Sequence, residues 1–422
     1  MVSIPRSPLG RLLPRQASVE VNAALSDTRV VLVNGARQCG KSTLVGQIAR
    51  ERGGVVRSLD DPVWREAARA DPTEFLASDA LQVIDEVQRV PELLLGIKLA
   101  VDSEPRPGRF LLTGSARLMG LRGVPDALPG RMETVELWPL SQSEIGQTGG
   151  GQFVDAVFNA GAELAVVSAE RRAGYVERLV RGGFPEAVAR EGKRREAFLD
   201  SYVAELVNRD VMQVAQIERA QEMRQLIGLL AARSGQILVP AVLSRRVGLP
   251  APTIRRYVDL LEEVFLVRRI PAWSRNLSQR ETGTPKIALV DSGIAASRLG
   301  YDAERLARLD SPLGGLLEGF VAMEIARQLT WSDSRVEMWH YRTKDQVEVD
   351  LVLEDRRGRV VAIDVKASST VRADDFRGIA HLEGRLGSDL VLGLVLYTGQ
   401  ETVPFGPRRR AMPIAALWEP LS

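Results

Sequence analysis

Apolar residues in the first third of the chain occur either in short continuous runs or at helical spacing. The short runs lie at residues 30–33, 55–59, 81–86, 109–115 and 135–140. Short apolar runs that alternate with helical stretches are typical of a parallel sheet with helices on both faces. We therefore predict an α/β domain over residues 29–148, after a lead-in at residues 1–28 that contains one helix at 17–25.

The pattern changes after the triplet Gly149-Gly150-Gly151, which is a candidate domain boundary. Residues 152–220 are expected to be mostly helical. Residues 221–275 have the pattern of a winged helix-turn-helix, with helices expected at 223–232, 240–247 and 252–262 and a wing beginning at 264–270.

Charges on the third of these helices bear on whether the middle region binds DNA. Arg255 and Arg256 lie where a recognition helix would contact DNA. Asp259, Glu262 and Glu263 follow on the same element and would repel phosphates. We therefore favour a structural module between domains, with DNA binding as the alternative.

The last third of the chain, residues 285–422, is predicted to be a second α/β domain. An amphipathic helix is expected at 313–327, and strands are expected at 336–341, 348–353, 360–366 and 390–397. The strands alternate with period two, so Asp364 and Lys366 should share one face of their sheet.

Composition narrows the class of protein. The 422 residues are 45% hydrophobic and 26% charged, which fits a globular protein of two to four domains. One cysteine excludes an internal disulfide framework, and two histidines argue against a histidine-based zinc site. The sequence has no apolar run long enough to span a membrane, so we expect a cytoplasmic protein without a membrane partner.

The most specific motif follows the first apolar run. It reads Gly35-Ala36-Arg37-Gln38-Cys39-Gly40-Lys41-Ser42-Thr43 and fits the phosphate-binding pattern G-x-x-x-x-G-K-[ST] at every fixed position. Its backbone N–H groups would converge on an anion at the start of a helix. Lys41 would neutralise the phosphates of ATP, the Ser42 hydroxyl would bind Mg²⁺, and Thr43 would support it.

Polar residues at later strand ends complete the expected ATPase site. We assign Asp85 to the metal and Glu86 to activation of the attacking water. Thr113 or Ser115 could sense the γ-phosphate, with a plain turn residue as the alternative. Arg131 could stabilise transition-state charge in the same chain or from a neighbour, although an exposed, solvated arginine is the simpler interpretation.

A second group of acids lies in the C-terminal third. Glu318 on the predicted helix, Asp350 on one strand and Asp364-x-Lys366 on the next could form a carboxylate Mg²⁺ site with a lysine near the attacking water. This is the chemistry of phosphodiester cleavage. A set of unrelated strand-end charges is the alternative, and spacing alone does not separate the two.

Together these motifs resemble those of a prokaryotic AAA-type ATPase family whose members carry a C-terminal domain of unknown function. The resemblance covers nearly the whole chain. It rests on the motifs at residues 35–43, 84–88, 112–115, 128–131, 183–185, Arg209-Asp210 and 348–350. It implies a P-loop NTPase fold in which Gly35, Gly40, Lys41, Ser42, Asp85 and Glu86 bind ATP. It also implies a C-terminal domain similar to the restriction-endonuclease-like fold, with matching residues Glu318, Asp350, Asp364 and Lys366.

Two function classes follow. The first is an Mg²⁺-dependent ATP hydrolase whose nucleotide cycle controls a nuclease-like domain that acts on DNA or RNA. The second is an ATP-gated switch, scaffold or signalling protein whose nuclease-like domain is inactive. Assembly into a homo-oligomer through the middle region, or binding of a protein partner, is compatible with both.

Overall fold

The computed structural model describes residues 8–114, 128–211, 219–276, 278, 280, 283–308 and 311–421. These residues form two compact units, which we describe separately. Unit 1 comprises residues 1–140, 184–189 and 263–265, and unit 2 comprises residues 141–183, 190–262 and 266–422. Ser115, one of the two predicted γ-phosphate sensors, lies outside the described residues.

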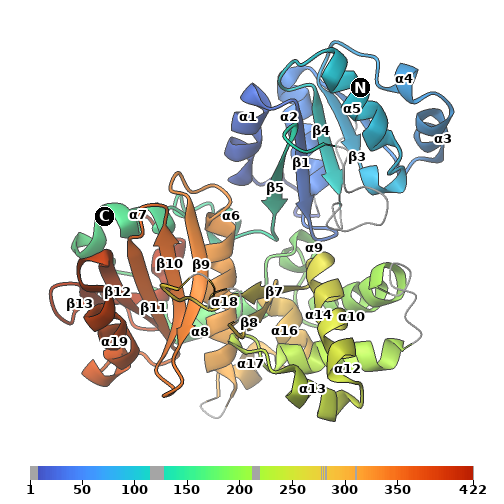
Figure 1. Cartoon of the computed structure of the whole chain (residues 1–422). Helices are drawn as coiled ribbons and strands as arrows, with labels where there is room; N and C mark the ends of the chain where they lie inside the picture. The colour runs from blue at the N-terminus through green and yellow to red at the C-terminus, as the bar shows by residue number, and fades with distance from the viewer. Residues whose placement is uncertain are drawn as a thin grey trace. The chain divides into compact units, whose positions relative to one another are not determined.

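Unit 1 is built on a five-stranded parallel sheet with the order β2-β3-β4-β1-β5 (Figure 1). The strands are β1 (Val30–Gly35), β2 (Val55–Ser58), β3 (Gln82–Asp85), β4 (Phe110–Gly114) and β5 (Met132–Leu137). All five predicted strands are therefore confirmed. The last one begins and ends three residues earlier than predicted, and Pro139, which has no N–H for a ladder hydrogen bond, lies beyond its end.

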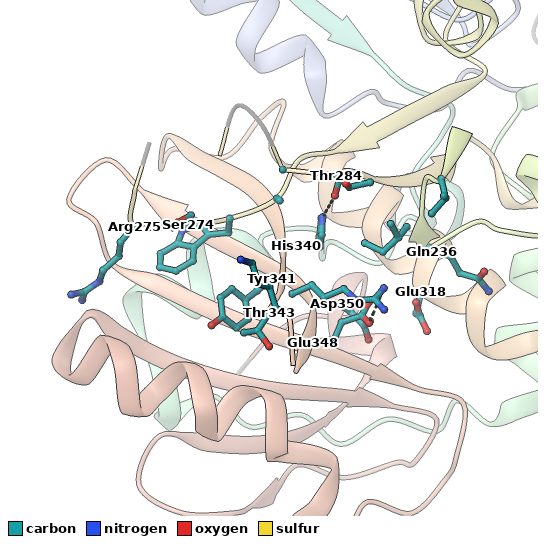
Figure 2. A pocket seen from close by; sticks show the side chains of 18 of the residues that line it. Gln236, Ser274, Arg275, Thr284, Glu318, His340, Tyr341, Thr343, Glu348 and Asp350 are labelled. Atoms are coloured by element: carbon teal, nitrogen blue, oxygen red, sulfur yellow. Dashed lines mark hydrogen bonds and ion pairs between the residues drawn. The ribbon is translucent and has the colours of Figure 1, made fainter. Parts of the chain in front are cut away.

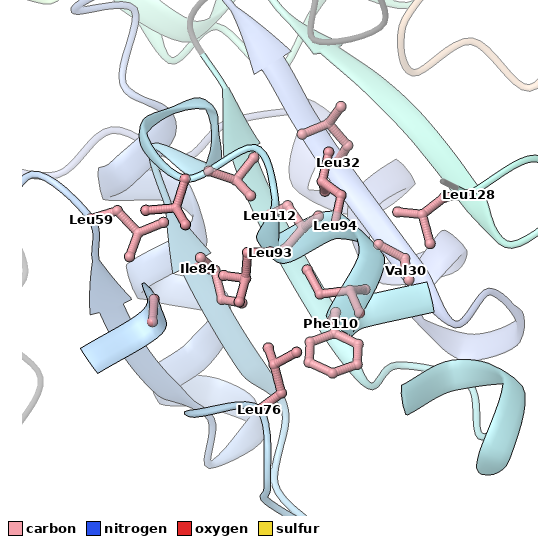
Figure 3. Close-up of a cluster of buried hydrophobic side chains, with 14 of the residues drawn as sticks. Val30, Leu32, Leu59, Leu76, Ile84, Leu93, Leu94, Phe110, Leu112 and Leu128 are labelled. Atoms are coloured by element: carbon pink, nitrogen blue, oxygen red, sulfur yellow. The ribbon is translucent and has the colours of Figure 1, made fainter. Parts of the chain in front are cut away.

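Helices cover both faces of this sheet. They are α1 (Ala17–Asp27), α2 (Lys41–Arg52), α3 (Pro62–Ala70), α4 (Pro72–Phe75) and α5 (Leu93–Ser103). Helices α1 and α2 pack against β1. The alternate strand side chains, including Leu32, Ile84 and Leu112, form a core with Leu93 and Leu94 of α5 (Figure 3). Alternation along the buried strands thus supplies apolar side chains to both helical layers.

Unit 2 begins with helices, as expected for residues 152–220. They are α6 (Gln142–Gly146), α7 (Phe153–Asn159), α8 (Arg172–Arg181) and α10 (Gly192–Glu205), which continues into a π-helical turn at Leu206–Val211. The short helix α9 (Pro185–Val188) belongs to unit 1.

The next part of unit 2 combines three helices with a small sheet. The helices are α12 (Ala220–Ala231), α13 (Pro240–Val247) and α14 (Ala251–Glu263), close to the predicted ranges. The sheet has the order β6-β8-β7, with β6 (Gln236–Ile237), β7 (Val267–Ile270) and β8 (Lys286–Leu289). The central strand β8 lies after residue 275, so this sheet extends past the end predicted for the middle region. Helices α16 (Ser292–Arg298) and α17 (Ala303–Leu306) follow.

A six-stranded mixed sheet forms the rest of unit 2, with the order β13-β14-β12-β11-β10-β9. Its strands are β9 (Val336–Arg342), β10 (Glu348–Asp355), β11 (Val360–Lys366), β12 (Leu390–Tyr397), β13 (Val403–Pro404) and β14 (Arg409–Pro413). Helices α18 (Leu313–Gln328) and α19 (Arg377–Leu386) both pack against β11. The four predicted strands and the predicted helix are confirmed, and β13 and β14 were not predicted. Among the described residues, no helix is long and apolar enough to cross a membrane.

Candidate functional site

The phosphate-binding motif forms the turn between β1 and α2. A β-carbon at Gly35 would lie 2.1 Å from the carbonyl oxygen of Leu137, so only glycine fits where β1 meets the end of β5. Gly40 has φ +104°, a left-handed conformation that favours glycine, and α2 begins at the next residue. The loop therefore leads directly into a helix N-terminus, the geometry that favours an anion.

Lys41 is folded back over this loop. Its Nζ donates hydrogen bonds to the carbonyl oxygens of Gly35 at 3.0 Å and Ala36 at 2.8 Å, and the residue is only 5% exposed. Cys39 is buried, and its thiol donates to the carbonyl oxygen of Leu137 at 3.3 Å. The cysteine thus fills the loop, as predicted.

An arginine that was not among the predicted site residues also contacts the loop. Arg15 donates from Nη1 to the carbonyl oxygen of Cys39 at 2.8 Å and from Nη2 to that of Trp138 at 2.7 Å. In a trans peptide the C=O and N–H groups point in opposite directions, so the Cys39 contact turns the N–H of Gly40 away from Arg15. The local sequence carries no signal for Arg15, because its contacts span 24 residues to Cys39 in the loop and 123 residues to Trp138, just after β5.

Four polar residues meet at the carboxyl edge of the sheet around Asp85. Ser42 Oγ donates to Asp85 Oδ1 at 3.0 Å, and Thr113 Oγ1 donates to the same oxygen at 2.6 Å. Ser58 Oγ donates to Asp85 Oδ2 at 3.3 Å. The backbone N–H of Glu86 in turn donates to Thr113 Oγ1 at 2.9 Å. Thr113, which is fully buried, therefore links Asp85 to the backbone of Glu86.

Glu86 adopts a strained backbone conformation. Its φ of 59° and ψ of 48° lie in the left-handed region, which is uncommon for residues other than glycine. Such strain concentrates at functional sites when the surrounding structure holds it. Here the hydrogen bond to Thr113 holds the backbone, and the Gln88 side-chain amide donates to the Glu86 carboxylate.

Arg131 lies at the opposite end of the sheet, which corrects its predicted role in the same chain. It precedes Met132, which pairs with Val30 at the amino end of β1, whereas the phosphate loop follows the carboxyl end. Five residues of strand, about 17 Å, separate the two ends. The Arg131 guanidinium instead forms a two-pronged ion pair with Asp102 of α5, at 2.5 and 3.0 Å.

The donor set at the carboxyl edge fits a magnesium nucleotide. Mg²⁺ prefers oxygen ligands, and Ser42 Oγ and Asp85 Oδ1 are two oxygens within 3.0 Å of each other. Lys41 and the start of α2 supply the positive charge that phosphates require. Among the predicted residues, Ser42, Asp85, Thr113 and Glu86 are connected by hydrogen bonds, and Lys41 adjoins Ser42 at the start of α2.

A second polar cluster lies in unit 2, around a buried lysine. Lys286, the first residue of β8, is 2% exposed. Its Nζ lies 2.8 Å from Asp350 Oδ1, 2.9 Å from Glu348 Oε1 and 3.8 Å from Glu318 Oε2. The three carboxylates border one open cavity of about 1410 Å³ (Figure 2). Neither Lys286 nor Glu348 was among the predicted residues.

The predicted acids Asp350 and Asp364 are tied together through the backbone. Asp350 N–H donates to Asp364 Oδ1 at 3.1 Å, and Val365 N–H donates to Asp350 Oδ2 at 3.0 Å. Burial and the neighbouring Asp350 raise the pKa of Asp364 to about 7. The same two causes raise the pKa of Glu318 to about 8. Burial alone would lower the pKa of Lys286, but the carboxylates of Asp350, Glu318 and Glu348 raise it.

These residues do not fit a divalent metal in the arrangement described. An ammonium group already lies at the point where Glu318, Glu348 and Asp350 meet. Within the described ranges, no group of three or more His, Cys, Asp or Glu side chains is placed to hold a metal ion. Of the residues predicted to hold a metal, Glu318 and Asp350 instead contact Lys286, and Asp364 contacts the backbone of Asp350. Lys366 lies near enough to both Glu318 and Asp364 to lower their pKa values, against the effect of burial.

Comparisons with known proteins divide the chain into three regions. A family described as an AAA domain matches residues 27–146. Two domains of unknown function match the remainder, DUF8612 at residues 172–305 and DUF4143 at residues 313–417.

Relatives and solved structures were also found. Uncharacterized proteins of Mycobacterium tuberculosis and Mycobacterium bovis are each 32% identical over 363 residues, which cover 84% of this chain and 74% of theirs. A Walker-type ATPase of Pyrococcus abyssi has a TM-score of 0.43 at 13% identity and covers 71% of this chain and 99% of its own. AMPPCP-bound DnaA of Aquifex aeolicus has a TM-score of 0.32 at 15% identity and covers 62% and 93%. Structural similarity this low carries no argument about function.

The assignment rests instead on the matched AAA domain, on the loop that joins β1 to α2, and on the mycobacterial relatives. The described sheet is parallel, and its motif-bearing loop precedes a helix, as a P-loop NTPase requires. The chain belongs to the same family as these mycobacterial proteins, and its amino-terminal part is an AAA-type ATPase domain that serves ATP binding and hydrolysis.

Proposed function

We propose that this protein is an Mg²⁺-dependent ATPase in which the loop 35–43 binds the phosphates, Ser42 and Asp85 hold the metal, and Glu86 activates water. The observation that carries the proposal is the network from Ser42 through Asp85 and Thr113 to Glu86. Its three hydrogen bonds connect the Ser42 hydroxyl, the Asp85 carboxylate, the Thr113 hydroxyl and the backbone N–H of Glu86, which supports these roles. An unrelated surface turn would not require these four residues to be connected.

Each residue has a separate task in this proposal. Lys41 exchanges its two carbonyl partners for phosphate oxygens, which are stronger acceptors because they are charged. Bound Mg²⁺ would neutralise charge on the phosphates. Glu86 accepts the proton of the attacking water at its carboxylate. Thr113 hydrogen-bonds to both Asp85 and the backbone of Glu86 and so fixes their relative positions. We therefore assign it a positioning role in place of direct γ-phosphate sensing.

We further propose that the nucleotide cycle acts on the C-terminal α/β domain as a switch and that this domain does not cleave nucleic acid in the form described. The support is Lys286, which neutralises the acids that a cleaving site would need for metal. The second candidate is control of an active nuclease-like domain. It is favoured by the acids Glu318 and Asp350, which border one cavity, and by Asp364-x-Lys366 beside them.

The middle region enters these proposals as a connecting module. Helices α12, α13 and α14 with the sheet β6-β8-β7 have the element types of a winged helix, and we infer that fold from their order. On α14, Asp259 and Glu262 both bind Arg269 of β7, at 2.7 and 2.5 Å. Asp259 and Glu262 thus tie α14 to β7, and this use of the helix within the fold supports a structural role. We keep three proposals for what the chain binds: DNA or RNA, another protein, or further copies of itself in a homo-oligomer.

The ATPase proposal is tested with Glu86→Gln. We expect this variant to bind ATP with wild-type affinity and to hydrolyse it at least about 100-fold more slowly, because the amide cannot take the proton. Nucleotide affinity and phosphate release are measured on the same samples. Glu92→Gln is the control, because Glu92 is an exposed carboxylate of the same unit that pairs only loosely with Arg69, at 3.5 Å. If Glu86→Gln hydrolysed ATP at the wild-type rate, a residue other than Glu86 would have to be the general base.

The two candidates for the C-terminal domain are separated by cleavage assays. DNA and RNA are incubated with the full chain, ATP and either Mg²⁺ or Mn²⁺. The switch proposal expects no cleavage that depends on Asp350. Cleavage by the wild type that disappears in Asp350→Ala would favour the nuclease.

A further inference from the structure

A lysine lies at the centre of the acidic cluster in unit 2, where the nuclease-like hypothesis would require a divalent ion. Lys286 is charged, yet it is 2% exposed. A buried ammonium is stable only when carboxylates surround it closely. Asp350 and Glu348, at 2.8 and 2.9 Å, meet this condition, and Glu318 follows at 3.8 Å.

The position of Lys286 is fixed by its strand. Strand β8 pairs with β6 on one side and with β7 on the other, and Lys286 itself pairs with Ile237 and Ile270. The backbone of this lysine therefore cannot slide without breaking both ladders. The four-carbon side chain reaches from the small sheet to Asp350 on β10 of the large sheet.

The small sheet also fits closely against α18, the helix that carries Glu318. A β-carbon at Gly235, which precedes β6, would lie 2.7 Å from the Glu318 Cβ and 2.9 Å from the Gly315 carbonyl oxygen. A β-carbon at Gly319 would lie 2.2 Å from Ser234 Oγ. Glycine at these positions allows the small sheet and α18 to approach closely, which brings Glu318 beside the sheet that carries Lys286.

We propose that the Lys286 ammonium is the resident cation of this cluster and excludes divalent metal from it as long as β8 remains packed beside β10 and α18. A metal ion bound by Asp350 and Glu348 would have to share the space of Nζ, since metal–oxygen distances are shorter than the 2.8 and 2.9 Å found here. The two cations would also repel each other strongly in a buried setting. The inference rests on the proposed nuclease-like character of the C-terminal domain and is independent of the ATPase site.

Metal binding tests the proposal directly, without any assay of activity. Full-length protein without nucleotide is titrated with Mn²⁺, and free Mn²⁺ is followed by electron paramagnetic resonance. Wild type is compared with Lys286→Met, which keeps the length of the side chain and removes its charge. Lys366→Met is the matched control, because it removes the same charge from the neighbourhood without vacating the position of Nζ.

Each protein is also prepared with Asp350→Asn, so that an ion bound elsewhere, including at the phosphate loop, cancels in the difference. We expect Asp350-dependent binding of one Mn²⁺ in Lys286→Met that is at least about tenfold tighter than in the wild type or Lys366→Met. Circular dichroism and thermal unfolding establish that the variants fold.

Two results would overturn the proposal. One is Mn²⁺ binding by the wild type that depends on Asp350 and is as tight as in Lys286→Met. The other is a folded Lys286→Met that gains no Mn²⁺ site. If Lys286→Met does not fold, the test uses only the comparison of wild type with Asp350→Asn. Any Mn²⁺ that the wild type binds through Asp350 would then contradict a resident lysine. Failure of the Glu86→Gln experiment would leave this result unaffected, so the two proposals fail separately.

Discussion

At the scale of single residues, the phosphate loop depends on side chains that hold its backbone as well as on those that would touch a nucleotide. Lys41 and Arg15 are both buried, and both donate to loop carbonyls, Lys41 to those of Gly35 and Ala36 and Arg15 to that of Cys39. The first can transfer its hydrogen bonds to a phosphate. The second is committed to Cys39 and Trp138, so its effect on ATP is indirect. Substitution of Lys41 should therefore remove a direct contact with ATP, whereas substitution of Arg15 should change ATP binding only through the loop.

Lys41→Ala should weaken ATP binding by about 1.5–3 kcal/mol, the value of a hydrogen bond to a charged group. Nucleotide affinity is measured by titration calorimetry with a non-hydrolysable analogue. Arg50→Ala serves as the control, because it removes one positive charge from an exposed position on the same helix α2. Equal affinities for Lys41→Ala and wild type would contradict the assignment of the loop.

Arg15→Ala should raise the Kd for ATP by about tenfold, since it removes the charge-assisted hydrogen bond to Cys39 that orients the Gly40 N–H, and the bond to Trp138 that anchors the arginine. Arg15→Lys should recover part of the affinity, because an ammonium can still donate to the Cys39 carbonyl but lacks the planar fork of the guanidinium that spans both carbonyls. Arg52→Ala is the matched control. It removes an exposed arginine that ties α2 to Asn22 of α1 by two hydrogen bonds, at 2.8 and 3.1 Å.

Thermal unfolding of the same variants separates positioning from stability. If Arg15→Ala lowers the unfolding temperature but leaves the Kd for ATP unchanged, Arg15 supports the fold alone and the positioning role is rejected.

At the scale of elements, strand β9 carries a buried histidine whose charge state depends on its surroundings. His340 is 1% exposed, and its Nε2 donates to the carbonyl oxygen of Thr284 at 2.9 Å. Burial lowers the pKa of His340 from 6.5 to about 4. The charged groups that face it are Lys286 of β8, Glu348 of β10 and Arg342 of its own strand. The imidazole is therefore neutral in the folded protein at neutral pH.

The neutral state of His340 makes the stability of this element depend on pH. In the unfolded chain the imidazole takes a proton below about pH 6.5, whereas in the folded chain it does so only near pH 4. Between these values the unfolded state binds more protons, so stability falls as the pH falls. The contribution lost between pH 7 and pH 4 should be at most about 3 kcal/mol.

His340→Gln isolates this contribution, because glutamine keeps an N–H donor for Thr284 and does not titrate. The free energy of unfolding in urea is compared at pH 7 and pH 4.5 for both proteins. We expect the wild type to lose more stability than the variant over this interval. A parallel loss in both would assign the acid sensitivity to other groups.

At the scale of the whole molecule, the position of Arg131 decides how it can take part in catalysis. It lies at the edge of the sheet away from its own phosphate loop, and its guanidinium is paired with Asp102. An arginine that stabilises the transition state raises the turnover rate by about 10³–10⁵-fold. Removing such an arginine would therefore lower turnover by a large, readily measured factor. We expect Arg131→Ala to keep ATP turnover within about twofold of the wild type at both low and high protein concentration.

Asp102→Asn is the companion variant, because it breaks the same ion pair from the other side. Similar small effects in the two variants would identify the pair as structural. A large loss of turnover in Arg131→Ala alone, at concentrations where chains associate, would show that Arg131 serves a neighbouring chain.

Much of the ATPase site could be predicted from the sequence, since its residues follow directly from strand ends. Lys41 and Ser42 come after β1, Asp85 ends β3 and Glu86 follows it, and Thr113 lies near the end of β4. Parallel strands bring their carboxyl ends to one edge, so strand assignment alone predicts that these side chains meet. The same rule argues against Arg131, which precedes both the predicted strand at 135–140 and the observed strand β5.

The chain by itself thus determined the parallel sheet, the anion-binding loop and the acids that face it, because each depends on neighbours close in sequence. Only the tertiary structure decided which cations meet the remaining polar groups. Lys286 reaches Asp350 across 64 residues, and Arg15 reaches Trp138 across 123. Spacing along a strand or helix specifies which side chains share a face, but the charge that neutralises a buried carboxylate is selected by how distant elements pack.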